Sequence, residues 1–392
     1  MSDATVIKPD LAFVNEFIKG GGESLKKCYQ CATCSVVCNV TPEGNPFPRK
    51  EMVLAQWGQK DKLITSADVW LCHQCSDCTA YCPRGAKPGE VLNAIRKQSI
   101  KHVAMIPFFA KMATEAKLLP VLFAIPMALF YVIMLVLGNT DISSIPRAEG
   151  GIMAYHLFFP VIWIDIVFTL TAIFAAISAF VGIKRLWSGM QAQAGGGMKS
   201  SGSLVGDIIT SLTTILAHSK FADCTVNKLR QWGHMLLFYS FVGLTLTTMW
   251  AVGYLYGNEL FGIQAFGPFH FGESPYPMSD PVKILALISS IAFAAGFIII
   301  LFNRFAKAGK AGIGSYFDWI FLLIVFGVGA TGMLSWALRL ADLSVGYIVY
   351  YFHLVFIWSL FAYAPYSKFA HLFYRTTAMV FAENSGRDKK QG

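Results

Sequence analysis

The sequence predicts an all-α protein in two parts, a small helical N-terminal domain followed by a bundle of six membrane-spanning helices. The chain of 392 residues is 55% hydrophobic and only 14% charged, with a mean hydropathy of +0.52, which is far too apolar for an ordinary soluble protein. Its long apolar stretches all lie beyond residue 117, whereas residues 1–117 are mixed and polar. A duplicated cysteine pattern lies in that polar part, and the segment between its two copies has a helical periodicity.

The cysteine pattern is the most specific motif in the chain. Its first copy is Cys28, Cys31, Cys34 and Cys38, and its second is Cys72, Cys75, Cys78 and Cys82, followed by Pro83. This spacing is typical of bacterial-type [4Fe–4S] ferredoxins, in which the fourth cysteine of a run binds the other cluster. The pattern therefore predicts one cluster on Cys28, Cys31, Cys34 and Cys82, and a second on Cys72, Cys75, Cys78 and Cys38.

Two other uses of clustered cysteines fit the sequence less well. Structural zinc usually takes two well-separated cysteine pairs rather than one dense group of four. A disulfide framework needs an oxidising compartment, and the N-terminus, MSDATVIKPD, has no apolar signal core.

The segment between the cysteine runs predicts helices. Met52, Val53, Leu54, Trp57 and Leu63 fit the apolar side of a helix, and a second helix is expected to begin at Ser66 or Asp68. Simple bacterial ferredoxins have short connections here, so residues 1–115 resemble the α-helical ferredoxin type.

Six apolar stretches predict the membrane helices. They lie near residues 118–137, 153–183, 232–256, 281–302, 316–338 and 345–367, and each is long enough for a bilayer core of about 20 residues. Basic residues gather in the loops 184–231 and 303–315, whereas the opposite loops hold few. The positive-inside rule then places the N-terminal domain and the C-terminus in the cytoplasm, at the inner membrane. This placement of the +9 net charge also argues against nucleic-acid binding.

The largest cytoplasmic loop has two parts. Residues 191–203 are rich in Gly, Ala and Ser and predict a linker. Apolar residues then recur at helical spacing from Leu204 to Leu216, which predicts an amphipathic helix at the membrane interface. Cys224 follows, and we expect it to be structural or incidental.

Histidines in the apolar stretches are candidate haem ligands. His353 and His371 lie 18 residues apart, five turns of one helix, so both rings would face the same way near opposite ends of it. His234, at the cytoplasmic start of the third stretch, is level with His371 and would hold one haem with it. Ionisable residues inside a membrane are usually functional, but interfacial histidines bonded to lipid headgroups are the alternative.

The segments from His353 to His371, with Pro365 between them, and from His234 to Gly243 resemble the haem-binding helices of nitrate reductase gamma-type cytochromes b. The resemblance implies that His353 and His371 each bind a haem. Where that family has a second histidine on the His234 helix, this chain has Leu244. His156, near the start of the second stretch, is then the best second ligand for the outer haem with His353, and His270 is a weaker one. His218 is the alternative for the inner haem.

The run from Cys28 to Cys38, CYQCATCSVVC, resembles the small iron–sulfur subunit of heterodisulfide reductase. Residues 116–385 resemble its cytochrome b partner, and residues 386–392 form a polar tail. This fusion resembles the C subunit of quinone-interacting membrane-bound oxidoreductase complexes of sulfate reducers. The resemblance implies a subunit that passes electrons from menaquinol through b haems and two [4Fe–4S] clusters to soluble flavin and iron–sulfur subunits, and onward to adenylylsulfate reductase. The alternatives are a heterodisulfide reductase-like conduit with another acceptor, or a membrane anchor without haem.

Two charged residues in the apolar stretches allow more than one interpretation. Asp165 lies inside the second stretch and suits either proton movement or a structural bond to a tyrosine. Lys283 opens the fourth stretch, where snorkelling to the interface is the simpler explanation than binding of a quinone.

Overall fold

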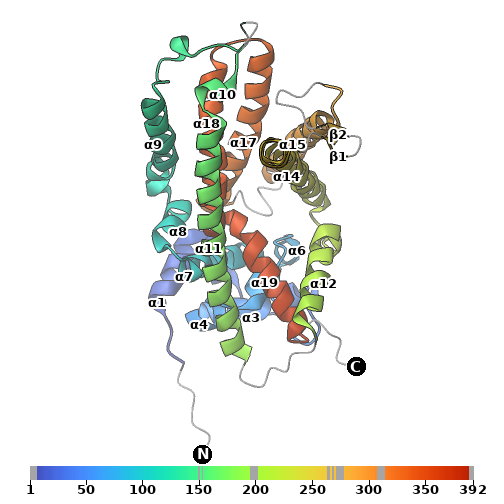
Figure 1. The fold of residues 1–392 in the computed structure, drawn as a ribbon. Helices are drawn as coiled ribbons and strands as arrows, with labels where there is room; N and C mark the ends of the chain where they lie inside the picture. The colour runs from blue at the N-terminus through green and yellow to red at the C-terminus, as the bar shows by residue number, and fades with distance from the viewer. Residues whose placement is uncertain are drawn as a thin grey trace, which may run out of the picture. The chain divides into compact units, whose positions relative to one another are not determined.

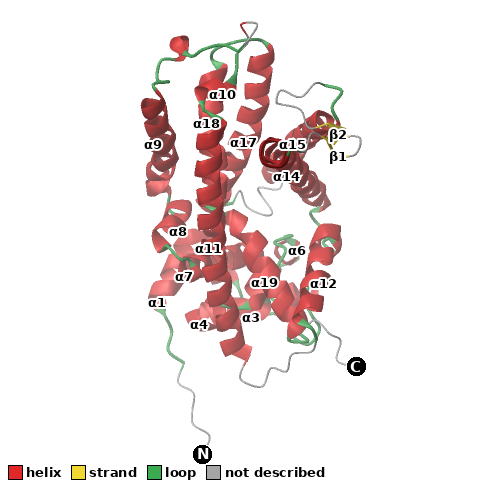
Figure 2. Ribbon diagram, in the orientation of Figure 1, coloured by secondary structure: helices red, strands yellow, loops and turns green. Residues whose placement is uncertain are grey.

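A computed structural model describes residues 7–148, 151, 153–194, 202–262, 265–266, 269–270, 278–306 and 314–387. The chain divides into two compact units, one made of residues 1–227 and 308–392 and the other of residues 228–307. Figures 1 and 2 show that the described elements are almost all helices. The exception is a pairing of the two-residue strands β1 (Ala265–Phe266) and β2 (Phe269–His270). The fold is all-helical, as predicted.

The N-terminal domain is built from short helices. They are α1 (Leu11–Phe17), a π turn (Ile18–Gly22), a 3-10 turn (Glu23–Lys27), α2 (Thr33–Val36), α3 (Arg49–Gln56), α4 (Lys60–Ile64), α5 (Ala67–Leu71), α6 (Asp77–Ala80), α7 (Pro88–Val103) and α8 (Pro107–Thr114). Helices α3, α4 and α5 fill the segment between the cysteine runs, so the predicted helical connection is confirmed. The long helix α7 packs against α6 of the second run, and most of its residues are buried.

Each of the six predicted apolar stretches forms a helix. In the first unit these are α9 (Leu119–Leu137), α11 (Val161–Ala194) preceded by the single turn α10 (Tyr155–Phe158), α17 (Tyr316–Leu340) and α18 (Gly346–Ala362). The second unit is the hairpin of α14 (Lys228–Phe261) and α15 (Pro281–Ala306). Five helices of the described chain are long and apolar enough to cross a membrane, and α18 is shorter. The chain is therefore consistent with a membrane protein, and the count of six spans stays a prediction.

The prediction that His353 and His371 lie on one continuous helix is wrong. Helix α18 ends at Ala362, and two 3-10 turns, Ala364–Tyr366 and Lys368–Ala370, separate it from α19 (His371–Asn384). Pro365 lacks a backbone N–H and cannot continue the helical hydrogen bonds. Ser367 is extended, and its hydroxyl caps the second turn by accepting from the Phe369 N–H over 3.2 Å. The two histidines are therefore positioned by different helices.

Helix α19 packs into the core of the N-terminal domain. The Tyr374 ring lies 5.2 Å from the Trp70 ring, and both side chains are buried. Helix α11 approaches the same core closely, since a Cβ on Gly182 would lie 2.3 Å from the Tyr374 hydroxyl. In Figure 1, α11 runs from the level of α18 down to the N-terminal helices. One hydrophobic core thus crosses the predicted domain boundary at residues 115 and 116.

The segment between α11 and α14 contains the predicted amphipathic helix, α12 (Leu204–Ala217). Its apolar side chains at Val205, Ile209 and Leu212 are exposed, as an interfacial helix requires. The opposite side packs on α19, where Asn384 donates to the Asp207 carboxylate over 2.8 Å. The linker residues 195–201 and the tail residues 388–392 lie outside the described residues.

Candidate functional site

The two cysteine runs share an unusual backbone. Gln30 and Ala32 in the first run have φ of 61° and 69°, and Gln74 and Ser76, at the equivalent positions of the second, have φ of 54° and 73°. Residues other than glycine rarely adopt this left-handed conformation, which is disfavoured by about 1–2 kcal/mol per residue. Strain of this kind is concentrated at functional sites. Each run therefore has the same backbone conformation around its second cysteine, Cys31 or Cys75.

A short helix completes each run. Helix α2 follows Ala32 and carries Cys34, and α6 follows Ser76 and carries Cys78. The fourth cysteine of each run lies just beyond that helix, where its N–H bonds back to a carbonyl three residues earlier. Helices α2 and α6 contact each other, so the two runs meet face to face.

Electrostatic interactions link thiols of the two runs. Cys34 interacts electrostatically with Cys28, Cys31 and Cys82, and not only with members of its own run. Cys38 interacts with Cys72 and Cys75 of the second run. Cys78 interacts with Cys72 and Cys75, and then with Cys38 and Cys34. The fourth cysteine of each run, Cys38 or Cys82, thus interacts with a thiol of the other run, as the predicted crossover of ligands requires. The ligand assignment itself stays a prediction.

Burial raises the pKa of several of these thiols. The pKa of Cys34 rises to about 11 and that of Cys38 to about 12, with burial as the largest cause and nearby cysteines adding to it. Burial also raises the pKa of Cys72 and Cys78. Metals bind thiolates, so cluster assembly would release the protons that these thiols hold. Two groups of four sulfur donors, partly shielded from water, fit [4Fe–4S] clusters.

Side chains from neighbouring helices hold the cysteine runs in place. Gln56 of α3 donates to the Cys28 carbonyl over 2.8 Å, and Arg49 donates to the Gln30 carbonyl over 2.9 Å. In the second run, Arg96 of α7 donates to the carbonyls of Val69 and Cys72. Bonds of this kind orient ligand residues before a metal binds. These neighbouring side chains therefore hold each run through its backbone carbonyls.

His353 of α18 has a defined tautomer. Its Nδ1 lies 3.0 Å from the Thr331 hydroxyl of α17. That hydroxyl donates its own proton to the Gly327 carbonyl, so it accepts the proton of His353 Nδ1. The lone pair is then at Nε2, the atom that would face a metal. Gly332 makes room for the ring, since a Cβ there would lie 2.8 Å from His353 Cε1.

His371, at the start of α19, also has its proton on Nδ1, but its partner is a backbone carbonyl. Its Nδ1–H donates to the Lys368 carbonyl over 2.8 Å. Lys368 is itself held by an ion pair of 2.5 Å with the buried carboxylate of Asp318 on α17. Asn93 of α7 donates to the same carboxylate over 3.3 Å. A polar network thus links the N-terminal domain, α17 and the turn that positions His371.

The other predicted histidine ligands lie on other elements. His234 lies on α14 in the second compact unit, so its pairing with His371 stays a prediction. His156 is exposed on α10, whereas its neighbour Tyr155 stacks on Tyr350 of α18 with ring centroids 4.4 Å apart. His218 is buried, with Nδ1 3.2 Å from the Leu216 carbonyl. The side chain of His270 lies outside what the structure describes.

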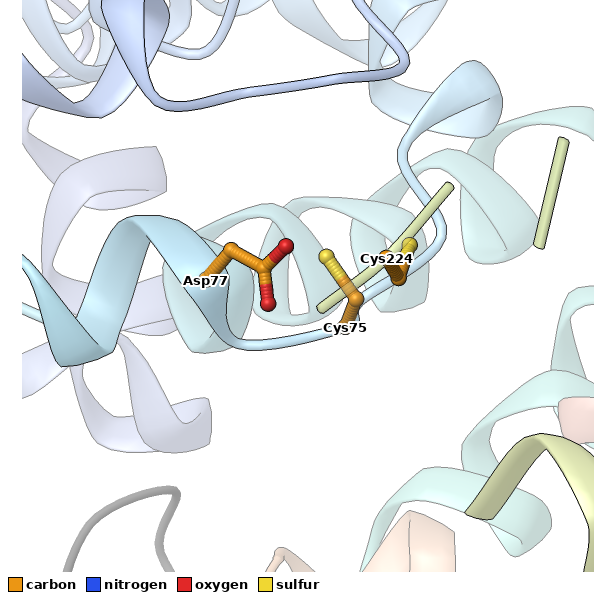
Figure 3. A group of neighbouring side chains, drawn as sticks. All are labelled: Cys75, Asp77 and Cys224. Atoms are coloured by element: carbon orange, nitrogen blue, oxygen red, sulfur yellow. The ribbon is translucent and has the colours of Figure 1, made fainter. Parts of the chain in front are cut away.

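Two residues that the sequence left open have neighbours in the structure. Asp165 of α11 lies near enough to Tyr350 to interact with it electrostatically, and its role stays open between proton movement and a structural bond. The Cys224 sulfur lies within 4.8 Å of both the Cys75 sulfur and an Asp77 carboxylate oxygen, and Figure 3 shows the three side chains together. Sequence spacing has no signal for this proximity, because Cys224 belongs to neither run.

Comparisons with known proteins support the iron–sulfur part of the site. Residues 24–86 match the family model "4Fe-4S dicluster domain". The C subunit of the H(2):CoB-CoM heterodisulfide,ferredoxin reductase from Methanothermobacter marburgensis is 34% identical over 101 residues, which are 25% of this chain and 53% of the relative. A protein from Archaeoglobus profundus, described as similar to the C subunit of heterodisulfide reductase, is 34% identical over 94 residues, which are 24% of this chain and 50% of the relative.

One similarity extends along nearly the full chain. Citrate utilization protein B from Escherichia coli is 24% identical over 381 residues, which are 94% of this chain and 93% of the relative. No solved structure matches. The chain spans about half the length of the heterodisulfide reductase relatives it matches. Its N-terminal part is a 4Fe–4S dicluster domain homologous to the C subunit of heterodisulfide reductase.

Proposed function

We propose that this protein is a membrane-bound electron-transfer subunit of an oxidoreductase complex, which oxidises menaquinol and passes the electrons to a soluble flavoprotein partner. Two [4Fe–4S] clusters and b haems would supply the one-electron chemistry when bound. The chain itself would position these groups, shield them from water and tune them. Adenylylsulfate reductase is the proposed final acceptor, by the resemblance to the C subunit of the quinone-interacting oxidoreductase complexes.

The observation that carries the proposal is the short connection between His371 and the second cysteine run. Arg375 lies one turn after His371 on α19 and bonds to the His73 ring, next to Cys72. Four residues of helix span only about 6 Å. Since α19 also packs on α5, which ends at Leu71, a haem held by His371 would lie close to the second cluster.

The proposed haem ligands follow from position and tautomer. His371 with His234 would hold the inner haem, and His353 with His156 the outer one. In both His353 and His371 the Nδ1 bond directs the Nε2 lone pair outward, the arrangement that second-shell bonds impose on metal-binding histidines. An anchor without haem would have no need of two histidines fixed in this tautomer.

A visible spectrum tests the proposal against the anchor. Purified protein reduced with dithionite should show the sharp bands of low-spin haem b together with iron–sulfur absorption. Menaquinol analogues should reduce the haem before an acceptor is added. Iron–sulfur absorption without haem bands would leave only the anchor function.

A second acceptor is favoured by the full-length similarity to citrate utilization protein B. In that case the same conduit would serve a soluble partner in citrate utilization instead of sulfate respiration. Copurification separates the two: the soluble proteins that bind the N-terminal domain would be either heterodisulfide reductase-like flavoproteins or proteins of citrate utilization.

The proposed orientation places both termini in the cytoplasm of an inner-membrane protein. Cysteines introduced at residues 202 and 203 should resist an impermeant thiol reagent in intact cells. Cysteines introduced at residues 278 and 279, just before α15 and on the proposed outer side of the membrane, should react. The reverse labelling would overturn the orientation.

A further inference from the structure

The second cysteine run has a fifth thiol beside it. Cys224 lies in the segment 218–226, far along the chain from both runs. Its side chain is 2% exposed, and its sulfur lies within 4.8 Å of the Cys75 sulfur. Figure 3 shows Cys75 between Asp77 and Cys224.

The proximity is fixed on both sides of Cys224. The Asp77 carboxylate accepts from the backbone N–H groups of Thr225 and Val226, each over 3.0 Å. Asn39, the residue after Cys38, donates to the Asp223 carbonyl over 2.9 Å. The segment 218–226 is therefore bound to both cysteine runs at the residues that flank Cys224.

Aromatic packing adds a third attachment. Phe221 lies against His73, with ring centroids 5.7 Å apart, and His73 directly follows Cys72. Because both Asp77 oxygens already serve these backbone bonds, Asp77 acts as the anchor of the segment. The groups left to meet a metal at this position are the two thiols.

We propose that Cys224 is an exchangeable ligand of the second [4Fe–4S] cluster and can replace Cys75 on the same iron. This inference rests on the proposed cluster function. A metal–thiolate bond of about 2.3 Å allows two sulfurs within 4.8 Å of each other to reach one metal position. Cys72 and Cys78 are buried, whereas Cys75 is only partly buried between two left-handed residues, Gln74 and Ser76. Cys75 is therefore the partly buried ligand that has a replacement thiol beside it.

The exchange balances without an oxidant or a reductant. The Cys224 thiol gives up its proton as its sulfur binds iron, and the bond between that iron and Cys75 breaks. The Cys75 thiolate then takes the proton. The cluster keeps four thiolate ligands and its charge throughout.

The test compares alanine variants of full-length protein purified anaerobically, with haem iron subtracted from total iron. Wild type should contain about eight non-haem iron atoms per chain with matching labile sulfide. Cys75→Ala should keep about eight, because Cys224 takes over. The double variant Cys75→Ala/Cys224→Ala should fall to about four, and so should the matched control Cys72→Ala, whose thiol is not part of the Cys75, Asp77 and Cys224 group.

Electron paramagnetic resonance of the reduced protein gives a second readout that does not depend on counting iron. Wild type and Cys75→Ala should both show the signals of two reduced clusters. The double variant Cys75→Ala/Cys224→Ala should show the signal of one cluster only.

Three results would overturn the exchange. These are loss of half the iron in Cys75→Ala, retention of all of it in the double variant, or the signal of only one reduced cluster in Cys75→Ala. A wild-type protein without labile sulfide would instead overturn the cluster function itself.

Discussion

The cysteine centre and the membrane histidines differ in how their geometry arises. The eight cysteines lie in two local runs, and each run has its conformation set by its own left-handed residues and short helix. His353 and His371 depend on contacts from other helices, through Thr331 for one and through Asp318 and Lys368 for the other. A site made by local sequence can be predicted from spacing, whereas a site made by packing requires the fold.

The largest effect is expected for Cys82, the cysteine of the second run that is predicted to bind the cluster of the first run. Cys82→Ala should remove the cluster of the first run, because Cys34 of that run interacts with Cys82 as well as with Cys28 and Cys31. Non-haem iron should fall from about eight to about four per chain. Electron paramagnetic resonance of the reduced protein should then match that of Cys34→Ala and differ from that of Cys78→Ala. A match to Cys78→Ala would show that each run binds its own cluster.

Loss of the inner haem is the next largest effect. On the proposed ligand assignment, His371→Ala and His234→Ala should each remove one of about two low-spin haems while leaving labile sulfide unchanged, because each variant would lack a proposed axial ligand. His102→Ala, on α7, is the matched control and should keep full haem content. If the His371 and His234 variants also keep it, the inner ligands lie elsewhere and His218→Ala becomes the variant to measure.

The same comparison shows what the sequence could and could not predict. The duplicated cysteine spacing predicts the two equivalent runs, because their conformation is local. The apolar pattern through residues 345–367 is continuous, so it hides the break after Ala362 that Pro365 and Ser367 impose. The burial of Tyr374 against Trp70 depends on contacts between residues some 300 positions apart, which periodicity cannot detect.

The outer haem gives a smaller and more specific test. His353→Ala and His156→Ala should abolish the same haem signal and slow quinol oxidation, with the inner haem retained. The exposed position of His156 makes it accessible to a group bound on that side. A His156→Ala protein with two intact low-spin haems would contradict this pairing and leave His353 with another second ligand.

The smallest effect concerns the stability of the N-terminal domain. Burial, and then the nearby Asp68 carboxylate, raises the pKa of Glu51 to about 8. The folded pKa lies above that of the unfolded chain, so the folded state binds the proton more tightly. The free energy of unfolding therefore falls as the pH rises toward 8, because Glu51 must ionise while buried. Glu51→Gln should therefore stabilise the protein at pH 8 by on the order of 4 kcal/mol and have little effect near pH 4.5.

Thermal unfolding in detergent at several pH values measures this difference. Glu43→Gln is the matched control, since Glu43 is exposed. A stability difference for Glu51→Gln that does not change between pH 5 and pH 8 would contradict the assigned protonation.

The most direct measurement of the central claim is a combined count of non-haem iron, labile sulfide and haem on the purified full-length protein. Two [4Fe–4S] clusters and two b haems predict about eight non-haem iron atoms, about eight sulfides and about two haems per chain. A protein with zinc in place of iron and no sulfide, or with iron and sulfide but no haem, would contradict an electron conduit from the membrane to the cysteine centre.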